Sequence, residues 1–179
     1  MPGRPAPGRP PHAGRRPTPP AEIELLLLDV DGVLTDGRLH FSARGEAHKV
    51  FHVRDGHGIK LLLGSGVTVA VASGRRSRAV TARMRELGVR HLAQGCADKL
   101  EALHAIGARL GIAPLACACL VDDTPDLPLM AAVGFAAAVA DAHPLVRSAA
   151  HWVSTLPGGA GAVRELCDLL LAARATRLG

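Results

Sequence analysis

The sequence predicts an α/β fold built on a central parallel sheet, and two observations support this prediction. Short aliphatic runs alternate with longer amphipathic segments, which is the pattern of βαβ units joined by right-handed crossovers. Several of these runs end directly in polar residues, as expected where strands reach the ligand-binding edge of such a sheet. We therefore predict a Rossmann-like three-layer sandwich with a small β-hairpin flap and no large cap domain.

The first predicted elements are a buried strand and a hairpin. Residues 24–30 form an aliphatic run typical of a strand that is buried on both faces. Polar and apolar residues alternate over residues 37–53 around a turn at 44–46, which predicts the hairpin. The interval between residues 31 and 73 has room for this hairpin and one helix only, which agrees with the absence of a large cap.

A helix, a strand and a second helix follow the hairpin. Asp55 is expected to cap the first helix, over about residues 55–63. A second buried strand is predicted at residues 68–72. The helix after it spans about residues 77–87 and is closed by Gly88, because glycine readily adopts the left-handed conformation that ends a helix.

The rest of the chain continues the alternation and shows no internal repeat. Asp98 is expected to start a helix that ends at Gly111. After a short strand at 91–93, the further predicted elements are this helix, a buried strand at 116–121, a short helix, a strand at 134–139, a brief strand near Trp152 and a closing helix at 162–173.

The net charge of +5 comes largely from the N-terminal segment. Residues 1–21 are rich in Pro, Gly, Ala and Arg, a composition that buries too little surface to order itself, so we expect a disordered arm. The segment contains no acid and four of the 21 Lys and Arg residues, which leaves 17 bases against 16 acids. With few aromatic residues to stack on bases, we expect no nucleic-acid partner.

The composition also indicates the cellular compartment of the protein. Cys96, Cys117, Cys119 and Cys167 lack zinc-ribbon or redox spacing, so we read them as reduced, small hydrophobic residues. No apolar run is long enough to cross a bilayer, and no secretory signal is recognisable. We expect a soluble cytoplasmic protein without a membrane partner, with one domain over residues 22–179.

Polar residues follow three of the predicted strands. Asp29 and Asp31 end the first, Ser73 ends the second, and Asp122 and Asp123 end a third. Because the carboxyl ends of parallel strands share one edge of a sheet, we expect these side chains to converge. Clustered carboxylates need a counter-ion, and ligands that are all oxygen favour Mg²⁺. Taken alone, Asp-x-Asp-Gly could also be a turn that caps a core strand.

The same residues predict phosphoryl transfer to a carboxylate nucleophile. Asp29 attacks a phosphate, and Asp31 gives a proton to the leaving alkoxide and later takes one from water. Lys99 and Ser73 hold the non-bridging oxygens as charge builds. The backbone N–H of Gly74 lies where a helix begins, which is a ready anion site.

At these residues the sequence resembles the haloacid dehalogenase superfamily of phosphatases. Within that superfamily it is similar to the 3-deoxy-D-manno-octulosonate 8-phosphate phosphatases, from about residue 24 to 172. The matching segments are Asp29-Val30-Asp31-Gly32-Val33-Leu34-Thr35-Asp36-Gly37, Val53-Arg54-Asp55-Gly56-His57-Gly58-Ile59, Gly74-Arg75, Gln94-Gly95 with Lys99, Asp122-Asp123 with Asp126, Val139-Ala140-Asp141-Ala142-His143-Pro144 and Gly161-Ala162-Val163-Arg164-Glu165.

The resemblance implies a role for each matching residue. Asp29 would be the nucleophile and Asp31 the general acid and base, and Asp29, the main-chain carbonyl of Asp31 and Asp122 would hold Mg²⁺. The implied activity belongs to lipopolysaccharide precursor synthesis. A homotetramer would complete each active site from a neighbouring subunit, which excludes water. The implied substrate contacts are Asp31, His52, Val53, Arg54, Asp55, Gly56, Lys60, Arg75, Arg83 and Lys99, beside the anion site at Gly74.

Some positions depart from the family pattern. Ser73 replaces a more usual Thr but keeps the hydroxyl, and Lys60 replaces Arg, so a bidentate contact becomes a point charge. His52 stands where Asn is common, Val121 replaces a Gly, and Ala160 lies where a longer side chain often occurs. None of these changes removes a catalytic group.

Two alternatives stay open from the sequence. The substrate could be a nonulosonate 9-phosphate, although Arg75 after Gly74 favours the octulosonate. The domain could instead be a non-catalytic oligomerisation or regulatory module.

Two further acids have supporting roles: Asp123 is expected to bond loop amides, and Asp126 to orient Lys99 or metal-bound water.

Overall fold

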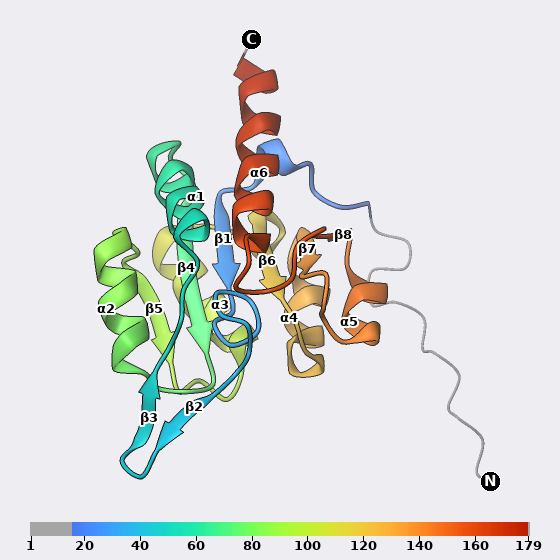
Figure 1. Cartoon of the computed structure of the whole chain (residues 1–179). Coiled ribbons are helices and arrows are strands. Elements are labelled where there is room, and N and C mark those ends of the chain that lie inside the picture. Colours follow the sequence, from blue (N-terminus) through green and yellow to red (C-terminus); the bar gives the residue numbers. More distant parts are fainter. Residues whose placement is uncertain (1–15, 179) are drawn as a thin grey trace, which may run out of the picture.

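The computed structural model describes residues 16–178, and its centre is a six-stranded sheet. All neighbouring strands pair in parallel, in the order β5-β4-β1-β6-β7-β8 (Figure 1). Their bounds are β1 Leu25–Leu28, β4 Thr68–Ser73, β5 His91–Gln94, β6 Cys117–Val121, β7 Phe135–Ala138 and β8 Trp152–Val153. The predicted α/β fold with a parallel sheet is confirmed.

Strand β1 lies at the centre of the hydrophobic core. Its four leucines are at most 1 % exposed, because the strand pairs with β4 on one side and β6 on the other and is covered on both faces. A strand buried in this way has no polar face, which explains why its sequence does not alternate. The register sets Leu28 beside Val71 and Leu120, so the three strands end close together.

Helices cover both faces of the sheet. Their bounds are α1 Val53–Gly64, α2 Arg78–Leu87, α3 Lys99–Leu110, α4 Leu127–Ala132, α5 Pro144–Ala149 and α6 Ala162–Leu178. Helix α1 packs against α6 and β4, whereas α3 packs against α4 and β4. Figure 1 shows α1 and α6 side by side in front of the sheet and α3 behind it. This arrangement is the predicted three-layer sandwich.

The predicted ends of two helices, α2 and α3, are confirmed by their caps. The Ser77 hydroxyl accepts from Val80 N at the start of α2, and the Asp98 carboxylate accepts from Leu100 N at the start of α3. Gly88 and Gly111 end these helices in the left-handed conformation, with φ of 83° and 70°. Short polar side chains and glycine are the common caps, so the sequence signals these ends well.

Two helix predictions need correction, and one helix was not predicted. Helix α1 begins at Val53 behind His52, which makes no side-chain cap, so Asp55 is not its cap. Helix α5 has no counterpart among the predicted elements, and it is capped by the His143 ring, an uncommon cap that sequence patterns miss. Helix α6 runs to Leu178, beyond the predicted end at residue 173.

The predicted hairpin is formed by β2 (His40–Ser42) and β3 (Gly45–His48), which pair antiparallel. Its turn lies between Ser42 and Gly45, one residue earlier than expected. Figure 1 shows the hairpin beyond the carboxyl ends of the central strands. It is the only part of the described chain, residues 16–178, that forms a second sheet, so no large cap domain covers this edge.

The predicted N-terminal arm lies mostly outside the described residues, which begin at Arg16. Thr18 is held by two bonds: its N–H donates to Gly134 O at 2.9 Å and its hydroxyl to Leu115 O at 2.8 Å. The short 3₁₀ turn η1 (Pro20–Glu22) then leads into β1. Residues 18–22 therefore pack on the amino ends of the central strands.

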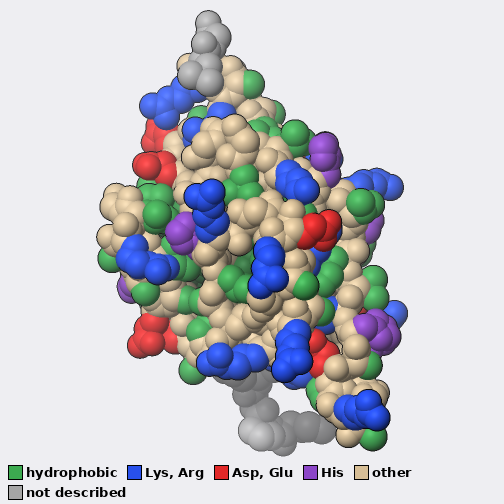
Figure 2. All heavy atoms as spheres, turned by 90° about the vertical axis from the view of Figure 1, so that its left-hand side faces the viewer, with side chains coloured by type: hydrophobic (Ala, Val, Ile, Leu, Met, Phe, Trp, Pro, Cys, Tyr) green, Lys and Arg blue, Asp and Glu red, His purple; other side chains and the backbone are tan. Residues whose placement is uncertain are grey.

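The remaining sequence expectations concern thiols, membranes and surface charge. All four cysteines are free, as predicted. Within residues 16–178, no helix combines the length and the apolar character that a bilayer crossing requires. Figure 2 shows Lys and Arg side chains spread over one face of the molecule, separated by other atoms rather than joined in one stripe.

Candidate active site

The loop after β1 carries the first acidic pair. Asp29 is 7 % exposed, and its Oδ1 accepts from Val30 N at 2.6 Å. The chain then turns tightly, because the N–H groups of Val33, Leu34 and Thr35 all bond to Val30 O. Because of this turn, Asp29 and Asp31 both lie close to the carboxyl end of β1.

Gly32 fits this turn for two reasons. Its φ is +89°, in the region that favours glycine. A Cβ at this position would also lie only 2.1 Å from Asp122 Oδ2, at the end of the neighbouring strand. The glycine therefore allows the β1 loop and the Asp122 carboxylate to approach each other closely.

Three carboxylates converge at this edge of the sheet. Asp29, Asp122 and Asp126 each offer one oxygen within 4.8 Å of the others. Burial and then the neighbouring Asp29 raise the pKa of Asp122 to about 8. Burial likewise raises the pKa of Asp126 to about 6, although Lys99 opposes the shift. The cluster therefore carries a charge conflict that a cation or a proton must relieve.

Lys99 is the cation that this chain supplies. Its Nζ lies 2.8 Å from Asp29 Oδ2 and 2.8 Å from Asp126 Oδ2. Burial acts to lower the pKa of Lys99, but the two carboxylates outweigh it and the net shift is upward. Lys99 is the first residue of α3, so the N-cap Asp98 fixes its position. The ammonium group stays charged at the mouth of the acid cluster.

An open cavity of about 330 Å³ lies over these groups. Ser73 ends β4, is 3 % exposed, and accepts from Arg75 N at 3.2 Å. Gly74 and Arg75 are exposed at the rim. The residues that line the cavity are Asp29, Asp31, Gly37, Ser73, Gly74, Arg75, Lys99, Asp122, Asp123, Pro125 and Asp126.

Two further acids, Asp123 and Asp126, line the cavity. Asp123 is exposed, and its carboxylate accepts from Thr124 N at 2.7 Å, which is a bond to a loop amide. Asp126 is 2 % exposed and accepts from Lys99. Its carboxylate also belongs to the acid cluster, so a metal-facing position of Asp126 is an addition to the predicted set of Asp29, Asp31 and Asp122.

Seven of the predicted substrate residues do not line this cavity. Asp55 is buried instead: its Oδ1 accepts from Arg164 N at 2.9 Å, at the start of α6, and burial raises its pKa. Gly56 leaves room for the Arg83 guanidinium, which would lie 2.2 Å from a Cβ there. The other four, all in α1 or at its start, are His52, Val53, Arg54 and Lys60.

The hairpin adds a residue that sequence reasoning missed. Lys49 follows β3, its side chain is 3 % exposed, and its ammonium group contacts Asp31 Oδ1. Arg75 also reaches the hairpin, with its guanidinium carbon 5.5 Å from the centre of the Phe41 ring. A lone lysine after a hairpin gives no signal in the sequence, because its partner lies 18 residues away.

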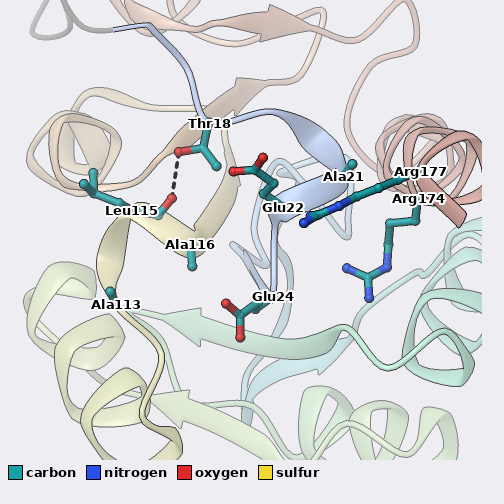
Figure 3. A pocket seen from close by; sticks show the side chains of 9 residues that line it. All are labelled: Thr18, Ala21, Glu22, Glu24, Ala113, Leu115, Ala116, Arg174 and Arg177. Carbon is teal, nitrogen blue, oxygen red and sulfur yellow. Dashed lines mark hydrogen bonds between the residues drawn. The ribbon is translucent and has the colours of Figure 1, made fainter.

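A larger cavity, about 790 Å³, lies at the other end of the sheet. It is lined by residues that precede β1 and β6 and by the last turns of α6. Figure 3 shows Glu22, Glu24, Arg174 and Arg177 directed into it, with Thr18 bonded to Leu115 at its side. Arg174 donates to Ile23 O at 3.1 Å. Acids and bases are balanced here, and none of these groups lies among the converging carboxylates.

The acid cluster fits a hard divalent cation. Its donors are all carboxylate oxygens, close enough to share one ion, and Mg²⁺ prefers such ligands. The neighbouring Lys99 and the Ser73 hydroxyl are suited to an anion that approaches the same place. A buried carboxylate, a second acid on the same loop and a paired lysine together can support transfer of a phosphoryl group.

Comparisons with known proteins agree with this geometry. Residues 91–163 match the model of a haloacid dehalogenase-like hydrolase family. The chain is 49 % identical over 154 residues to "3-deoxy-D-manno-octulosonate 8-phosphate phosphatase KdsC" of Yersinia pestis, which covers 86 % of this chain and 82 % of the relative.

Solved structures extend the comparison to the fold. The crystal structure of the Yersinia pestis phosphatase has a TM-score of 0.85 at 48 % identity, covering 89 % of this chain and 86 % of that chain. The enzyme of the same name from Moraxella catarrhalis has a TM-score of 0.85 at 39 % identity, covering 88 % and 90 %. That structure is in complex with a magnesium ion, a phosphate ion and a KDO molecule.

Proposed function

The chain belongs to the 3-deoxy-D-manno-octulosonate 8-phosphate phosphatase family of haloacid dehalogenase-like hydrolases, and from this we propose how its site works. It is a Mg²⁺-dependent phosphoric monoester hydrolase that releases phosphate from 3-deoxy-D-manno-octulosonate 8-phosphate. This reaction supplies a lipopolysaccharide precursor. A single phosphatase domain covers residues 22–179, and we place the enzyme in the cytoplasm because its four cysteines are free.

The observation that carries this function is the acid cluster beside a paired lysine. Asp29, Asp122 and Asp126 each offer one oxygen within 4.8 Å of the others, and Lys99 Nζ lies 2.8 Å from both Asp29 and Asp126. Structural ion pairs also perturb pKa values, but this cluster lines an open cavity at the carboxyl edge of the sheet. Such a place suits chemistry on an anionic substrate.

In the first step, Asp29 acts as the nucleophile. Its Oδ attacks phosphorus, the bond from phosphorus to the sugar oxygen breaks, and an aspartyl-phosphate forms. Asp31 gives its proton to the departing sugar oxygen, which would otherwise leave as a high-energy alkoxide. Lys99 and the Ser73 hydroxyl bind the non-bridging oxygens as charge builds. Asp29, Asp122 and the main-chain carbonyl of Asp31 would hold Mg²⁺, which would supply the positive charge that screens the nucleophile and the phosphate from each other.

In the second step, Asp31 takes a proton from water. The resulting hydroxide attacks phosphorus, the bond to Asp29 breaks, and inorganic phosphate leaves with Asp29 restored as a carboxylate. Asp31 is protonated again and ready for the next substrate. Asp123 keeps the Asp122 loop in place through its bond to Thr124 N, and Asp126 orients Lys99.

A neighbouring subunit completes the site in this proposal. Large apolar side chains of the hairpin and the start of α1 are exposed, with Phe41 at 60 %, Val50 at 60 % and Val53 at 76 %. Exposed apolar surface of this kind is typical of a protein interface. His52, Arg54 and Lys60 lie on the same part of the chain, so they would contact substrate from a neighbour in a homotetramer. Arg83 would join them, whereas Gly74 and Arg75 contact substrate within one chain.

A release assay tests the function directly. Purified protein is supplied with 3-deoxy-D-manno-octulosonate 8-phosphate or with a nonulosonate 9-phosphate, each with Mg²⁺ or with a chelator, and free phosphate is measured. We expect release that depends on Mg²⁺ and is faster from the octulosonate than from the nonulosonate, because Arg75 rather than an acid follows Gly74. Preference for the nonulosonate would reassign the substrate. Absence of release from both would support a non-catalytic module instead.

A further inference from the structure

Three side-chain contacts hold the hairpin over the carboxyl edge of the sheet. Lys49 contacts Asp31, Glu46 accepts from the Ser77 hydroxyl, and Phe41 lies under the Arg75 guanidinium. Each partner belongs to the cavity or to the N-terminus of α2 next to it. The hairpin is therefore docked on active-site residues rather than on the apolar core.

Lys49 is the most buried part of this docking. Its side chain is 3 % exposed, whereas those of Asp31 and Glu46 are 22 % and 19 % exposed. The ammonium group contacts Asp31 Oδ1 and also lies 3.4 Å from Glu46 Oε2. Glu46 is fixed in turn by Ser77, which caps α2. A chain of contacts thus runs from the N-terminus of α2 to the carboxylate of Asp31.

Asp31 depends on this lysine for its orientation. Within residues 16–178, Lys49 is the single hydrogen-bond or ion-pair partner of the Asp31 carboxylate. Lys49 contacts Oδ1, no group of residues 16–178 bonds Oδ2, and Asp31 lines the cavity. A general acid must hold its proton within hydrogen-bond reach of the leaving oxygen, so the position of this free oxygen matters for the rate.

We infer that Lys49 is a positioning residue that holds Asp31 Oδ1 so that Oδ2 exchanges protons with the substrate. This inference rests on the proposed phosphatase function. The Lys49 ammonium group keeps its own protons throughout. The proton that reaches the departing sugar oxygen comes from Asp31, and the proton that restores Asp31 comes from water. A docked hairpin is then a condition for efficient proton transfer to the leaving group.

The leaving group offers a test that a purely structural role would not pass. Lys49→Met and wild type are compared in kcat/KM on 3-deoxy-D-manno-octulosonate 8-phosphate and on p-nitrophenyl phosphate. The nitrophenolate leaves without a proton, so transfer of the phosphoryl group from this substrate does not need a proton from Asp31. We expect Lys49→Met to lower kcat/KM for the sugar phosphate by a factor on the order of 10². For the aryl phosphate, kcat/KM should change by no more than about threefold. Asp31→Asn should give the same pattern.

Controls separate this role from folding. Arg44→Met removes a charge from the exposed turn of the same hairpin and should leave the ratio of the two kcat/KM values unchanged. Lys49→Gln keeps a hydrogen-bond donor and should restore part of the sugar-phosphate rate. In Asp31→Asn, adding Lys49→Met should not change the ratio further, because the two residues act as one unit. Circular dichroism and thermal unfolding show whether each variant folds.

Three outcomes overturn the inference. Equal losses on both substrates would show that Lys49 supports the whole site, and no loss on either would show that it has no part in the reaction. A further change of the ratio in the Asp31→Asn background would show that Lys49 acts without Asp31. If wild type fails on the sugar phosphate, the proposed function fails, and the inference is still tested with an unactivated alkyl phosphate in its place.

Discussion

The polar groups at the two ends of the sheet differ in charge balance. At the amino end, the larger cavity holds Glu22 and Glu24 opposite Arg174 and Arg177, and the charges balance (Figure 3). At the carboxyl end, the smaller cavity gathers carboxylates, and burial together with the neighbouring Asp29 raises the pKa of Asp122. The size of a cavity therefore does not locate the chemistry here. An unbalanced cluster of buried acids does, because it requires a ligand to complete it.

The largest expected difference between the two ends is catalytic. Asp29→Asn removes the nucleophile and should lower kcat by a factor on the order of 10⁴ or more. The same change removes a negative charge from the cluster, so the thermal unfolding temperature without Mg²⁺ should rise. Phosphate release and thermal unfolding measure the two effects.

Arg177→Ala, at the opposite end of the sheet, is the matched control and should keep full activity. Substantial activity in Asp29→Asn, or a large loss in Arg177→Ala, would place the chemistry elsewhere.

The second expected difference is a pH-dependent affinity for metal. Asp122 has a pKa of about 8 because burial and Asp29 favour its protonated form. A proton must therefore leave when Mg²⁺ binds at neutral pH, and the apparent affinity should rise about tenfold per pH unit from pH 6 towards pH 8. Isothermal titration calorimetry at pH 6, 7 and 8 measures this slope. An affinity that is constant over this range would show that the cation does not displace the Asp122 proton.

Gly32 offers a smaller change at the carboxyl end. Gly32→Ala places a Cβ 2.1 Å from Asp122 Oδ2 and forces an unfavourable φ of +89°, so it should destabilise the fold by about 1–3 kcal/mol. Mg²⁺ binding should weaken as well, because the Asp122 carboxylate has to move. Urea unfolding and metal titration report the two effects.

Gly45→Ala, at a positive φ in the hairpin turn with open space around it, is the control for backbone strain alone. If it weakens Mg²⁺ binding as much as Gly32→Ala does, the contact with Asp122 is not the cause.

Asp55 provides the smallest effect, through an acid outside the cavity. Burial raises the pKa of Asp55 in the folded state above the ordinary value of 3.8. As the pH rises, Asp55 therefore ionises in the unfolded chain before it ionises in the folded protein. Its charge therefore costs stability, and this cost develops as the pH rises from about 3.8 through the raised pKa. Asp55→Asn keeps an acceptor for Arg164 N, so its stability relative to wild type should increase over this range.

Urea unfolding at pH 4 and pH 7 measures the Asp55 effect. Asp55→Ala, which removes the acceptor as well, should be about 1 kcal/mol less stable than Asp55→Asn at both values. A difference between Asp55→Asn and wild type that does not change with pH would contradict a raised pKa.

Local patterns in the sequence predicted most of the fold. The four leucines of β1, the caps at Ser77 and Asp98, and the closing glycines each act over a few neighbouring residues, so their signals are readable without the structure. Topology did the same for the site, because strand ends at Asp29, Ser73 and Asp122 meet at one edge by the rule for parallel sheets.

The remaining features depend on contacts between distant parts of the chain. Asp55 is predicted as a cap of its own helix, but it bonds Arg164, which is 109 residues away. Lys49 meets Asp31 only once the hairpin has folded back over the sheet. Such pairings have no period and no local composition, so a single sequence does not reveal them.

Anomalous diffraction from a crystal soaked in Mn²⁺ locates the cation, since Mn²⁺ accepts the same oxygen ligands as Mg²⁺. We expect one ion between the carboxylates of Asp29 and Asp122, at the carboxyl end of the sheet. An ion beside Glu22 and Glu24 instead, or no ion near Asp29, would contradict this expectation.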